Sequence, residues 1–500
     1  MRLLTNKWIR IAGLAALVSM AMLVGCSSRG SAPAAKQKAS TRGAALTPQQ
    51  QAMLKGSYRF TKDGWIYVHL QGTPEEVGFQ HGYLLAPEIA DAFRAERIYQ
   101  VHTTHHRWSF FRAAAQNMLW PKIYPEYQQE LQGIVAGLHA HGVELDLDDI
   151  VALNAFSELP GYYAPWYDAR HKKQEAAAGF SPVAADSFRY DHCSAFVATG
   201  SYTKNHDIVI AHNNWTSYFE GERWRIMFDI VPEHGYGILM DGFPGVITSD
   251  DDFGINSDGI MITETTISDF HGWNPNGIPE FARSREALQY ASSITDYVKL
   301  LNKGNNGGYA NDWLLGDRKN GEIARFEEGL THTRLWTTKN GYFVGSNFPS
   351  DPSVIKDETT FNVRNMASSA NARHLRWEQL MKEYKGKIDI QLAEKFEADH
   401  YDTYEKKTDP DERTLCGHID LDPRGKHAFE PSGAVQSKVT DSELAAHMSL
   451  IAHLGHPCGE SFYVKPFLKA HPQYDWEKSI LGNMPAYPWT EFTAGERARH

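Results

Sequence analysis

The spacing of apolar positions along this chain changes near residue 190. Before that point, apolar residues recur with the period of a helix face, which predicts helices over 87–99, 126–140 and 147–159. The second of these ends at His141-Gly142, because a glycine just after the last apolar position is typical of a helix C-terminus. Residues 165–190 are polar, rich in alanine and poorly patterned, which indicates an exposed linker.

Beyond residue 190 the apolar positions form short runs separated by turn residues, as in β-strands. Helical spacing returns over 283–301, 371–384 and 390–396. Strands and helices do not alternate strictly, so the pattern disfavours a doubly wound parallel sheet and favours stacked antiparallel sheets flanked by helices. The predicted strands cover 194–199, 208–212, 224–231, 237–240, 259–266, 313–316, 323–328 and 342–345.

The amino terminus has the features of an export signal. Basic residues precede an apolar run over 11–24, which is too short to span a bilayer comfortably. The run ends in Leu23-Val24-Gly25-Cys26, which resembles the bacterial lipobox, whose cysteine is acylated and becomes the first residue of the mature protein. An ordinary signal peptide and a membrane anchor are the alternatives. Ser27, where an aspartate would favour the inner membrane, indicates attachment to the outer membrane, on its periplasmic face or at the surface.

Four segments follow from this pattern: a signal peptide (1–25), a flexible tether (26–55), a mainly helical segment (56–192) and a strand-rich segment (193–500). We expect the last two to form one domain. The chain has 50 basic and 61 acidic residues, a net charge of −11, which argues against a nucleic-acid partner and against broad attraction to anionic lipid. No dinucleotide or phosphate loop and no Gly-x-Ser-x-Gly motif occurs, so neither a cofactor nor a serine α/β-hydrolase is expected.

The four cysteines differ in their expected roles. Cys26 carries lipid, and Cys416 and Cys458 could form a disulfide in an oxidising compartment. Cys193 is left over, at the start of a predicted strand just after the predicted linker. A lone cysteine is more often a small buried hydrophobe than a nucleophile. A cut before Cys193 would change this, because the new α-amine, with a pKa of about 8, could act as general base for a thiol with a pKa of about 8.5.

The predicted hairpin brings polar residues beside this cysteine. A turn centred between Thr203 and Lys204 would place Cys193 opposite Asn214. The segment from His212 to Trp215 would then return beside the thiol, where its side chains could hold the amine or donate to an oxyanion.

Several short segments resemble known families. Residues 72–82, Gly-Thr-Pro-Glu-Glu-Val-Gly-Phe-Gln-His-Gly, and 153–158, Leu-Asn-Ala-Phe-Ser-Glu, resemble the isopenicillin N acyltransferase-like family. The second half is similar to the phospholipase B-like proteins, in Cys-Ser-Ala at 193–195, His-Asn-Asn-Trp at 212–215, and in 242–253, 263–266 and 309–313; Asn-Ala-Arg at 371–373 resembles a segment of both. Both families are N-terminal-nucleophile (Ntn) hydrolases, so the resemblance implies a four-layer αββα sandwich, an α+β fold with a cysteine exposed by self-cleavage.

The resemblance also implies roles for individual residues. Cys193 would be the nucleophile, and His212 and Trp215 match the His-x-x-Trp of the phospholipase B-like proteins. Asn214 stands where the acyltransferase-like proteins usually carry an aspartate that contacts the amine. Asn311 matches an asparagine expected near the oxyanion. Arg373 would stabilise the region around the nucleophile. The expected substrate-binding residues are Glu264, Thr265 and Asp252.

No metal site is expected from the remaining clusters. His102, His105 and His106 lack a clear set of partners. His453, His456 and Cys458 could form a soft site, but a turn with a Cys416–Cys458 disulfide is favoured. Asp250-Asp251-Asp252 lacks the spacing of a calcium loop and indicates a polar loop near the active cleft.

We therefore expect an exported, lipid-anchored hydrolase or acyltransferase that cleaves an amide bond of a small N-acylated molecule through a thioester on Cys193. One alternative is a phospholipase B-like deacylase of lipid esters, because the same chemistry serves both bonds. The alternative of another class is a non-catalytic, lipid-anchored binding protein with the same fold.

Overall fold

The computed structural model describes residues 45–177, 193–250, 253–425 and 427–498. The predicted signal peptide, Cys26, most of the tether, Asp252 and the residue before Cys193 lie outside these ranges. Among the helices of the described residues, none has both the length and the apolar character needed to span a membrane.

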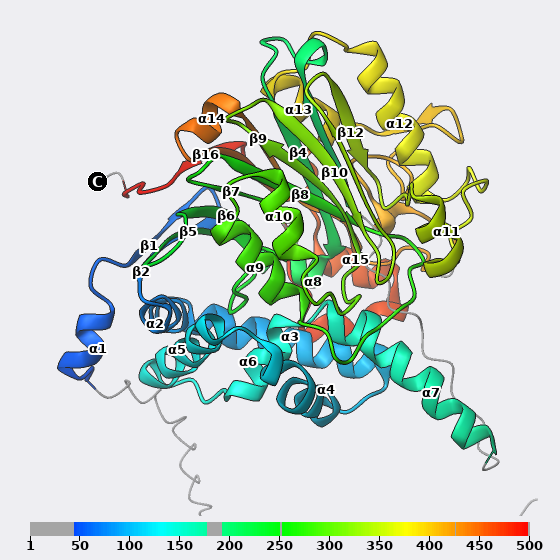
Figure 1. Ribbon diagram of the computed structural model, residues 1–500. Helices are drawn as coiled ribbons and strands as arrows, with labels where there is room; N and C mark the ends of the chain where they lie inside the picture. The colour runs from blue at the N-terminus through cyan, green and yellow to red at the C-terminus, as the bar shows by residue number, and fades with distance from the viewer. Residues whose placement is uncertain (1–44, 178–192, 251–252, 426, 499–500) are drawn as a thin grey trace, which may run out of the picture. The chain divides into compact units, whose positions relative to one another are not determined.

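Two sheets form the centre of the fold (Figure 1). In the first sheet every neighbouring pair is antiparallel except β2 and β5, which are parallel. Its nine strands are, in spatial order, β1 (Tyr58–Lys62), β2 (Trp65–Gly72), β5 (Ile226–Pro232), β6 (Ile238–Gly242), β7 (Gly254–Asn256), β8 (Ile260–Thr266), β9 (Asn311–Asp317), β10 (Glu322–Glu328) and β11 (Thr333–Thr338).

The second sheet is antiparallel throughout and contains the strand that follows Cys193. Its order is β12 (Gly341–Gly345), β3 (Ser194–Thr199), β4 (Val209–Ser217), β15 (Ser432–Asp441), β16 (Ser449–Leu454) and β17 (Thr490–Thr493). A separate two-stranded ribbon pairs β13 (Tyr401–Asp402) with β14 (Lys407–Thr408).

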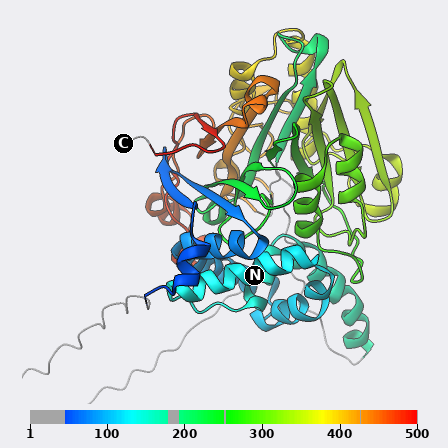
Figure 2. The same cartoon turned by 60° about the vertical axis from the view of Figure 1, so that its left-hand side comes forward.

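The two sheets pack face to face, and helices cover their outer faces. Apolar side chains such as Met227 and Leu314 of the first sheet meet Ala195 and Ile210 of the second in one buried cluster. A larger cluster lies between the first sheet and one set of helices, and a smaller one between the second sheet and α12 and α13. Figures 1 and 2 show helices on the outer faces of the two sheets. The expected αββα sandwich is thus confirmed. The covering helices are α2 (Pro74–Leu84), α3 (Ala86–Thr104), α5 (Pro125–His141), α6 (Leu147–Asn154), α9 (Glu280–Tyr290) and α10 (Ile294–Leu301) on the first sheet, and α12 (Ser369–Glu383) and α13 (Ile390–Glu397) on the second.

Three predicted elements are wrong in part. The helix expected over 147–159 ends at Asn154, and a separate π-helix covers Leu159–Tyr163. The helix expected over 283–301 is two helices, because the chain turns at Ala291 and Ser293 caps α10 by accepting a hydrogen bond from the Asp296 amide. The linker expected over 165–190 is helical as far as residue 177, consistent with its many strong helix formers. The remaining helices are α1 (Pro48–Met53), α4 (Trp108–Ala114), α7 (Ala164–Ala177), α8 (Tyr218–Gly221), α11 (Pro352–Glu358), α14 (Ser442–Ala446) and α15 (Val464–Ala470).

Helices α2 and α5 cross at unusually close range. Thr73 and Glu76 form a reciprocal capping box at the start of α2, and Pro74 takes the first helical position. One turn apart on the same helix, Gly78 and Gly82 face the backbone of α5; a Cβ on Gly82 would lie 2.0 Å from the carbonyl oxygen of Ile134. These glycines belong to the segment 72–82, so at this point the motif encodes helix packing.

The substitution Gly82→Ala tests this crossing. The added methyl group meets rigid backbone, so we expect a loss of about 1–3 kcal/mol of unfolding free energy, measured as a lower thermal midpoint. Gly237→Ala is the matched control, since the nearest atom to its added Cβ is 3.7 Å away. Equal midpoints for the two variants would contradict the close packing.

Candidate active site

The hairpin of β3 and β4 fixes the position of Cys193. Ser194 pairs with Asn213, and Ala198 pairs with Val209, so Cys193 at the head of β3 stands opposite Asn214. This confirms the predicted register. The connection is longer than a tight turn, because a 3-10 turn at Gly200–Tyr202 precedes the return strand.

Residues from both sheets gather around the thiol. Cys193 is 4% exposed, and His212 of β4 and Glu264 of β8 are fully buried. The Cys193 Sγ, a His212 ring nitrogen and a Glu264 carboxylate oxygen all lie within 4.8 Å of one another. The Tyr309 hydroxyl donates to Glu264 Oε1 at 3.0 Å and so orients that carboxylate. Thiol, imidazole and carboxylate together could move protons, and they could also hold a metal ion.

A buried arginine holds the backbone of Cys193. Arg373, on α12, donates through Nη1 to the Cys193 carbonyl oxygen and, at 3.0 Å, to the Ser194 hydroxyl. Its Nη2 donates to Asn347 Oδ1 at 2.8 Å, and its Nε donates to Ser369 Oγ at 2.9 Å. Every nitrogen of the guanidinium therefore has an acceptor, which restricts Arg373 to a positioning role.

Trp215 lies on the other face of β4 from His212, because side chains alternate along a strand. Its ring packs 4.6 Å from the Arg373 guanidinium, and its Nε1 donates to the Leu415 carbonyl at 3.2 Å. Trp215 is thus linked to Cys193 through Arg373, which contacts both residues.

Two predicted amides are buried close to this cluster. Asn214 is the neighbour of Cys193 across the hairpin, and Asn311 begins β9, two residues after Tyr309. The Nδ2 groups of Asn214 and Asn311 have no hydrogen-bond partner among the described residues. Thr265 is also buried, and it lies against Gly345 of the second sheet. Buried donors without acceptors are costly, so a bound oxygen atom would be stabilised there.

The amino-terminal motifs hold the loops that surround the site. His81 Nε2 accepts from the Gly245 amide at 3.0 Å, and Asn154 donates to the Gly245 carbonyl at 2.8 Å. Glu158 accepts from the Glu280 amide and from Asn306 Nδ2, which lies just before the Tyr309–Asn311 segment. These three motif residues therefore hold the loop at Gly245 and the segments at Glu280 and Asn306 in position.

A buried ion pair between the sheets was not predicted. Lys438 Nζ lies 3.1 Å from Asp241 Oδ2, and Gln436 Nε2 donates to the same oxygen at 2.8 Å. Lys438 pairs across the sheet with His212, and Gln436 pairs with Asn214. The β-branched residues Val435, Val439 and Thr440 are the signal that could have identified strand β15.

The other sequence candidates take separate positions. His102 stacks on Trp476, His105 ends α3 in a left-handed conformation, and His106 Nε2 lies 3.0 Å from Asp168 Oδ1, so these three do not form one site. Of the aspartate run, Asp250 is buried and accepts from the Ser157 hydroxyl at 2.6 Å.

The expected disulfide is corrected by the structure. Cys416 and Cys458 are free thiols that both face His418 Nε2. His453 and His456, expected beside Cys458, differ from each other: His453 Nδ1 lies 3.3 Å from the Gly455 carbonyl, while the His456 ring lies tilted against the His418 ring.

Comparison with known proteins identifies the family. The model of the phospholipase B family matches residues 95–500, so the chain belongs to this family. It is 25% identical over 300 residues to the phospholipase B of Crotalus adamanteus, covering 53% of this chain and 52% of that protein. It is 24% identical over 245 residues to the 40 kDa form of the acyl-coenzyme A:6-aminopenicillanic-acid-acyltransferase of Emericella nidulans, covering 48% of this chain and 57% of that protein.

Among solved structures, a variant of the conjugated bile acid hydrolase of Clostridium perfringens aligns with a TM-score of 0.33 at 12% identity, over 52% of this chain and 89% of that chain. The chain spans little more than half the length of the curated relatives it matches first.

The Arg373 contacts predict a specific loss of stability. In Arg373→Lys a single ammonium group replaces the three nitrogens of the guanidinium, so some of the buried acceptors lose their hydrogen bonds. We expect the free energy of unfolding to fall by about 2–4 kcal/mol. Arg364→Lys, at an exposed position ahead of the same helix, is the control and should leave the thermal midpoint unchanged. If both variants unfold at the wild-type temperature, Arg373 does not hold the head of β3.

Proposed function

We propose that this protein is a self-processed N-terminal-cysteine hydrolase or acyltransferase that cleaves N-acyl amides through a thioester on Cys193. The observation that carries the proposal is a thiol at the head of a central strand, with its carbonyl held by Arg373 and with His212 and Glu264 within reach. Membership in the phospholipase B family supports the class of reaction.

Maturation begins with the Cys193 thiol attacking the carbonyl of residue 192. The peptide C–N bond breaks, its nitrogen takes a proton and becomes the α-amine of Cys193, and a thioester remains on sulfur. Water then attacks the thioester, which releases a carboxylate at residue 192 and regenerates the thiol. Because Arg373 binds the carbonyl on the other side of the Cys193 Cα, the residue stays in place when the chain is cut.

Turnover uses the same two groups. The α-amine takes the thiol proton, and the thiolate attacks the substrate carbonyl. The resulting ammonium returns a proton to the leaving amine as the C–N bond breaks, leaving an acyl thioester. Water, or an acceptor amine, then attacks with the α-amine as base. Asn214 cannot supply the negative charge of the aspartate expected near the amine, and Glu264 is the carboxylate that takes this role.

Oxyanion stabilisation falls to the buried amides of Asn214 and Asn311. Both Nδ2 groups lack acceptors among the residues that the structure describes, and both lie in a water-poor interior. Removing one oxyanion donor costs about 3–4 kcal/mol in comparable sites.

The second candidate is a deacylase of lipid esters. Its support is that one relative is named a phospholipase B. The other relative described above is named an acyltransferase of 6-aminopenicillanic acid, which supports the amide proposal. Thioester formation serves either bond, so the choice rests on what the pocket accepts.

A substrate panel tests the proposal. Purified protein is assayed with N-acyl amino acids, acyl amides and phospholipids, alongside Cys193→Ala and Asn311→Ala. We expect turnover of N-acyl compounds, none by Cys193→Ala, and turnover reduced about 10²–10³-fold by Asn311→Ala at unchanged thermal stability. Asn117→Ala, on an exposed helix surface, is the matched control.

The panel separates the alternatives. Turnover that survives in Cys193→Ala would rule out the nucleophile. Hydrolysis of phospholipids alone would replace the amide proposal by the ester one, and no turnover of any compound by matured protein would favour the binding protein.

We also propose attachment to the outer membrane through lipid on Cys26, because the segment ahead of it resembles a lipoprotein signal. Cys26→Ala should remove the acyl groups and move the protein from the membrane to the soluble fraction of a fractionated bacterial host. Wild-type protein found without lipid in the soluble fraction would contradict the anchor.

A further inference from the structure

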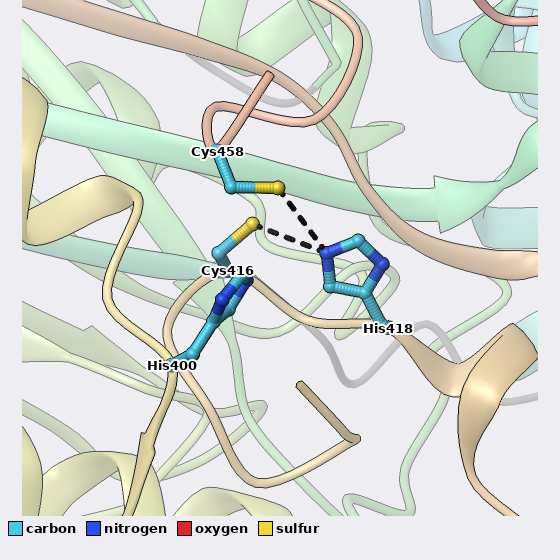
Figure 3. Close-up of side chains that lie close together, drawn as sticks. All are labelled: His400, Cys416, His418 and Cys458. Atoms are coloured by element: carbon cyan, nitrogen blue, oxygen red, sulfur yellow. Dashed lines mark hydrogen bonds between the residues drawn. The ribbon is translucent and has the colours of Figure 1, made fainter. Parts of the chain in front are cut away.

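Four side chains outside the candidate active site converge on one point (Figure 3). They are His400, just ahead of β13, Cys416 and His418, which precede the 3-10 turn Ile419–Leu421, and Cys458, in the loop after β16. Their sulfur and ring-nitrogen atoms all lie within 4.8 Å of one another. Two thiols and two imidazoles are the donor set of structural zinc sites in proteins.

The distances fit a shared ion better than a disulfide. His418 Nε2 lies 3.5 Å from Cys416 Sγ and 3.5 Å from Cys458 Sγ. A tetrahedral ion with bonds of about 2.3 Å to sulfur and about 2.05 Å to nitrogen places neighbouring S and N atoms about 3.5 Å apart. Both thiols are free, whereas a disulfide needs the two sulfurs about 2.0 Å apart.

The surroundings of His418 orient its ring toward the thiols. Asp420 Oδ1 lies 3.7 Å from His418 Nδ1, and the Tyr218 hydroxyl donates to the same carboxylate oxygen at 2.6 Å. A carboxylate behind a histidine fixes the ring and makes its other nitrogen a better ligand, as in many zinc sites. The His456 ring lies tilted against the His418 ring, with the two ring centroids 4.2 Å apart.

We propose that His400, Cys416, His418 and Cys458 bind one zinc-type divalent transition-metal ion. All four donors are protein side chains, so the site is closed and structural. It joins three segments of the chain, those around His400, around Cys416 and His418, and around Cys458. The first two are also linked by the Cys416 amide, which donates to the Asp399 carbonyl at 3.0 Å.

The residues of the proposed metal site also contact the residues that hold Cys193. Gly417, between two of the ligands, lies so close to Trp215 that a Cβ would be 2.0 Å from the ring. Leu415, next to Cys416, accepts hydrogen bonds from Asn213 and Trp215. The Trp215 ring in turn packs on Arg373, which holds the Cys193 carbonyl. Metal binding would therefore fix the backbone on which Trp215 and Arg373 rest.

Metal analysis of the full-length protein tests the proposal. Protein produced with zinc in the medium should contain one zinc ion per chain, and cobalt exchanged into the site should give the thiolate charge-transfer and tetrahedral absorption bands of a Cys₂His₂ site. Cys416→Ser and Cys458→Ser should each lose the zinc and the cobalt spectrum. A strong chelator should lower the thermal midpoint of wild-type protein, a readout that does not depend on whether the variants fold.

Cys193→Ala is the matched control, because Cys193, His212 and Glu264 form the other group of donors among the described residues. It should keep the full zinc content and the cobalt spectrum. The proposal is overturned if wild-type protein contains no metal and peptide mapping without reductant shows Cys416 joined to Cys458. It is equally overturned if the zinc is lost in Cys193→Ala.

Discussion

The hydrogen bond from Arg373 to the carbonyl of Cys193 is the contact on which the site depends. Under the proposed mechanism, Cys193 must stay in place after the chain ahead of it is cut, so it has to be held from its carboxyl side. Strand β3 supplies part of that hold through its ladders with β4 and β12. Arg373 supplies the rest at Cys193 itself, and losing such buried hydrogen bonds to a charged group costs about 2–4 kcal/mol. The sheet and one buried charge thus supply the rigidity that the proposed mechanism requires at Cys193.

Most of the residues that make this chain look like its relatives are structural. Gly82 permits the close crossing of two helices, while His81 and Asn154 hold the loop around Gly245. Glu158 fixes the segment that leads to Asn311. The groups that do chemistry under the proposed mechanism are few and lie between the sheets, so relatives with the same motifs could act on different acyl bonds.

The sequence predicted those features that depend on local pattern. The β3–β4 hairpin is local, so apolar runs and a turn were enough to place Cys193 opposite Asn214. Strand β15 was missed because the side chains that face the first sheet include Gln436 and Lys438. In the sequence these residues suggest an exposed surface, but in the structure both contact the buried Asp241 of the first sheet. Helix α7 was read as a linker because it has no apolar stripe.

Side-chain direction and long-range contacts could not be predicted. Trp215 was expected beside the thiol, but alternation along β4 turns it to the opposite face. Cys416 and Cys458 were expected to form a disulfide. The fold also brings His400 and His418 close to both thiols, which the sequence did not indicate. Glu264, expected as a substrate-binding residue, lies close to the thiol and comes from the other sheet, which its spacing could not predict. Each of these depends on how separate elements pack, which residue spacing does not encode.

The most direct test of the account is the chemical state of the Cys193 α-amine. Purified protein is labelled with an amine-selective reagent, digested and mapped by mass spectrometry, together with intact-mass measurement under denaturing conditions. The account predicts two chains, the second beginning with Cys193 and carrying the label on its α-amine. A single chain with the bond between His192 and Cys193 intact, in protein that turns over an acyl substrate, would contradict it.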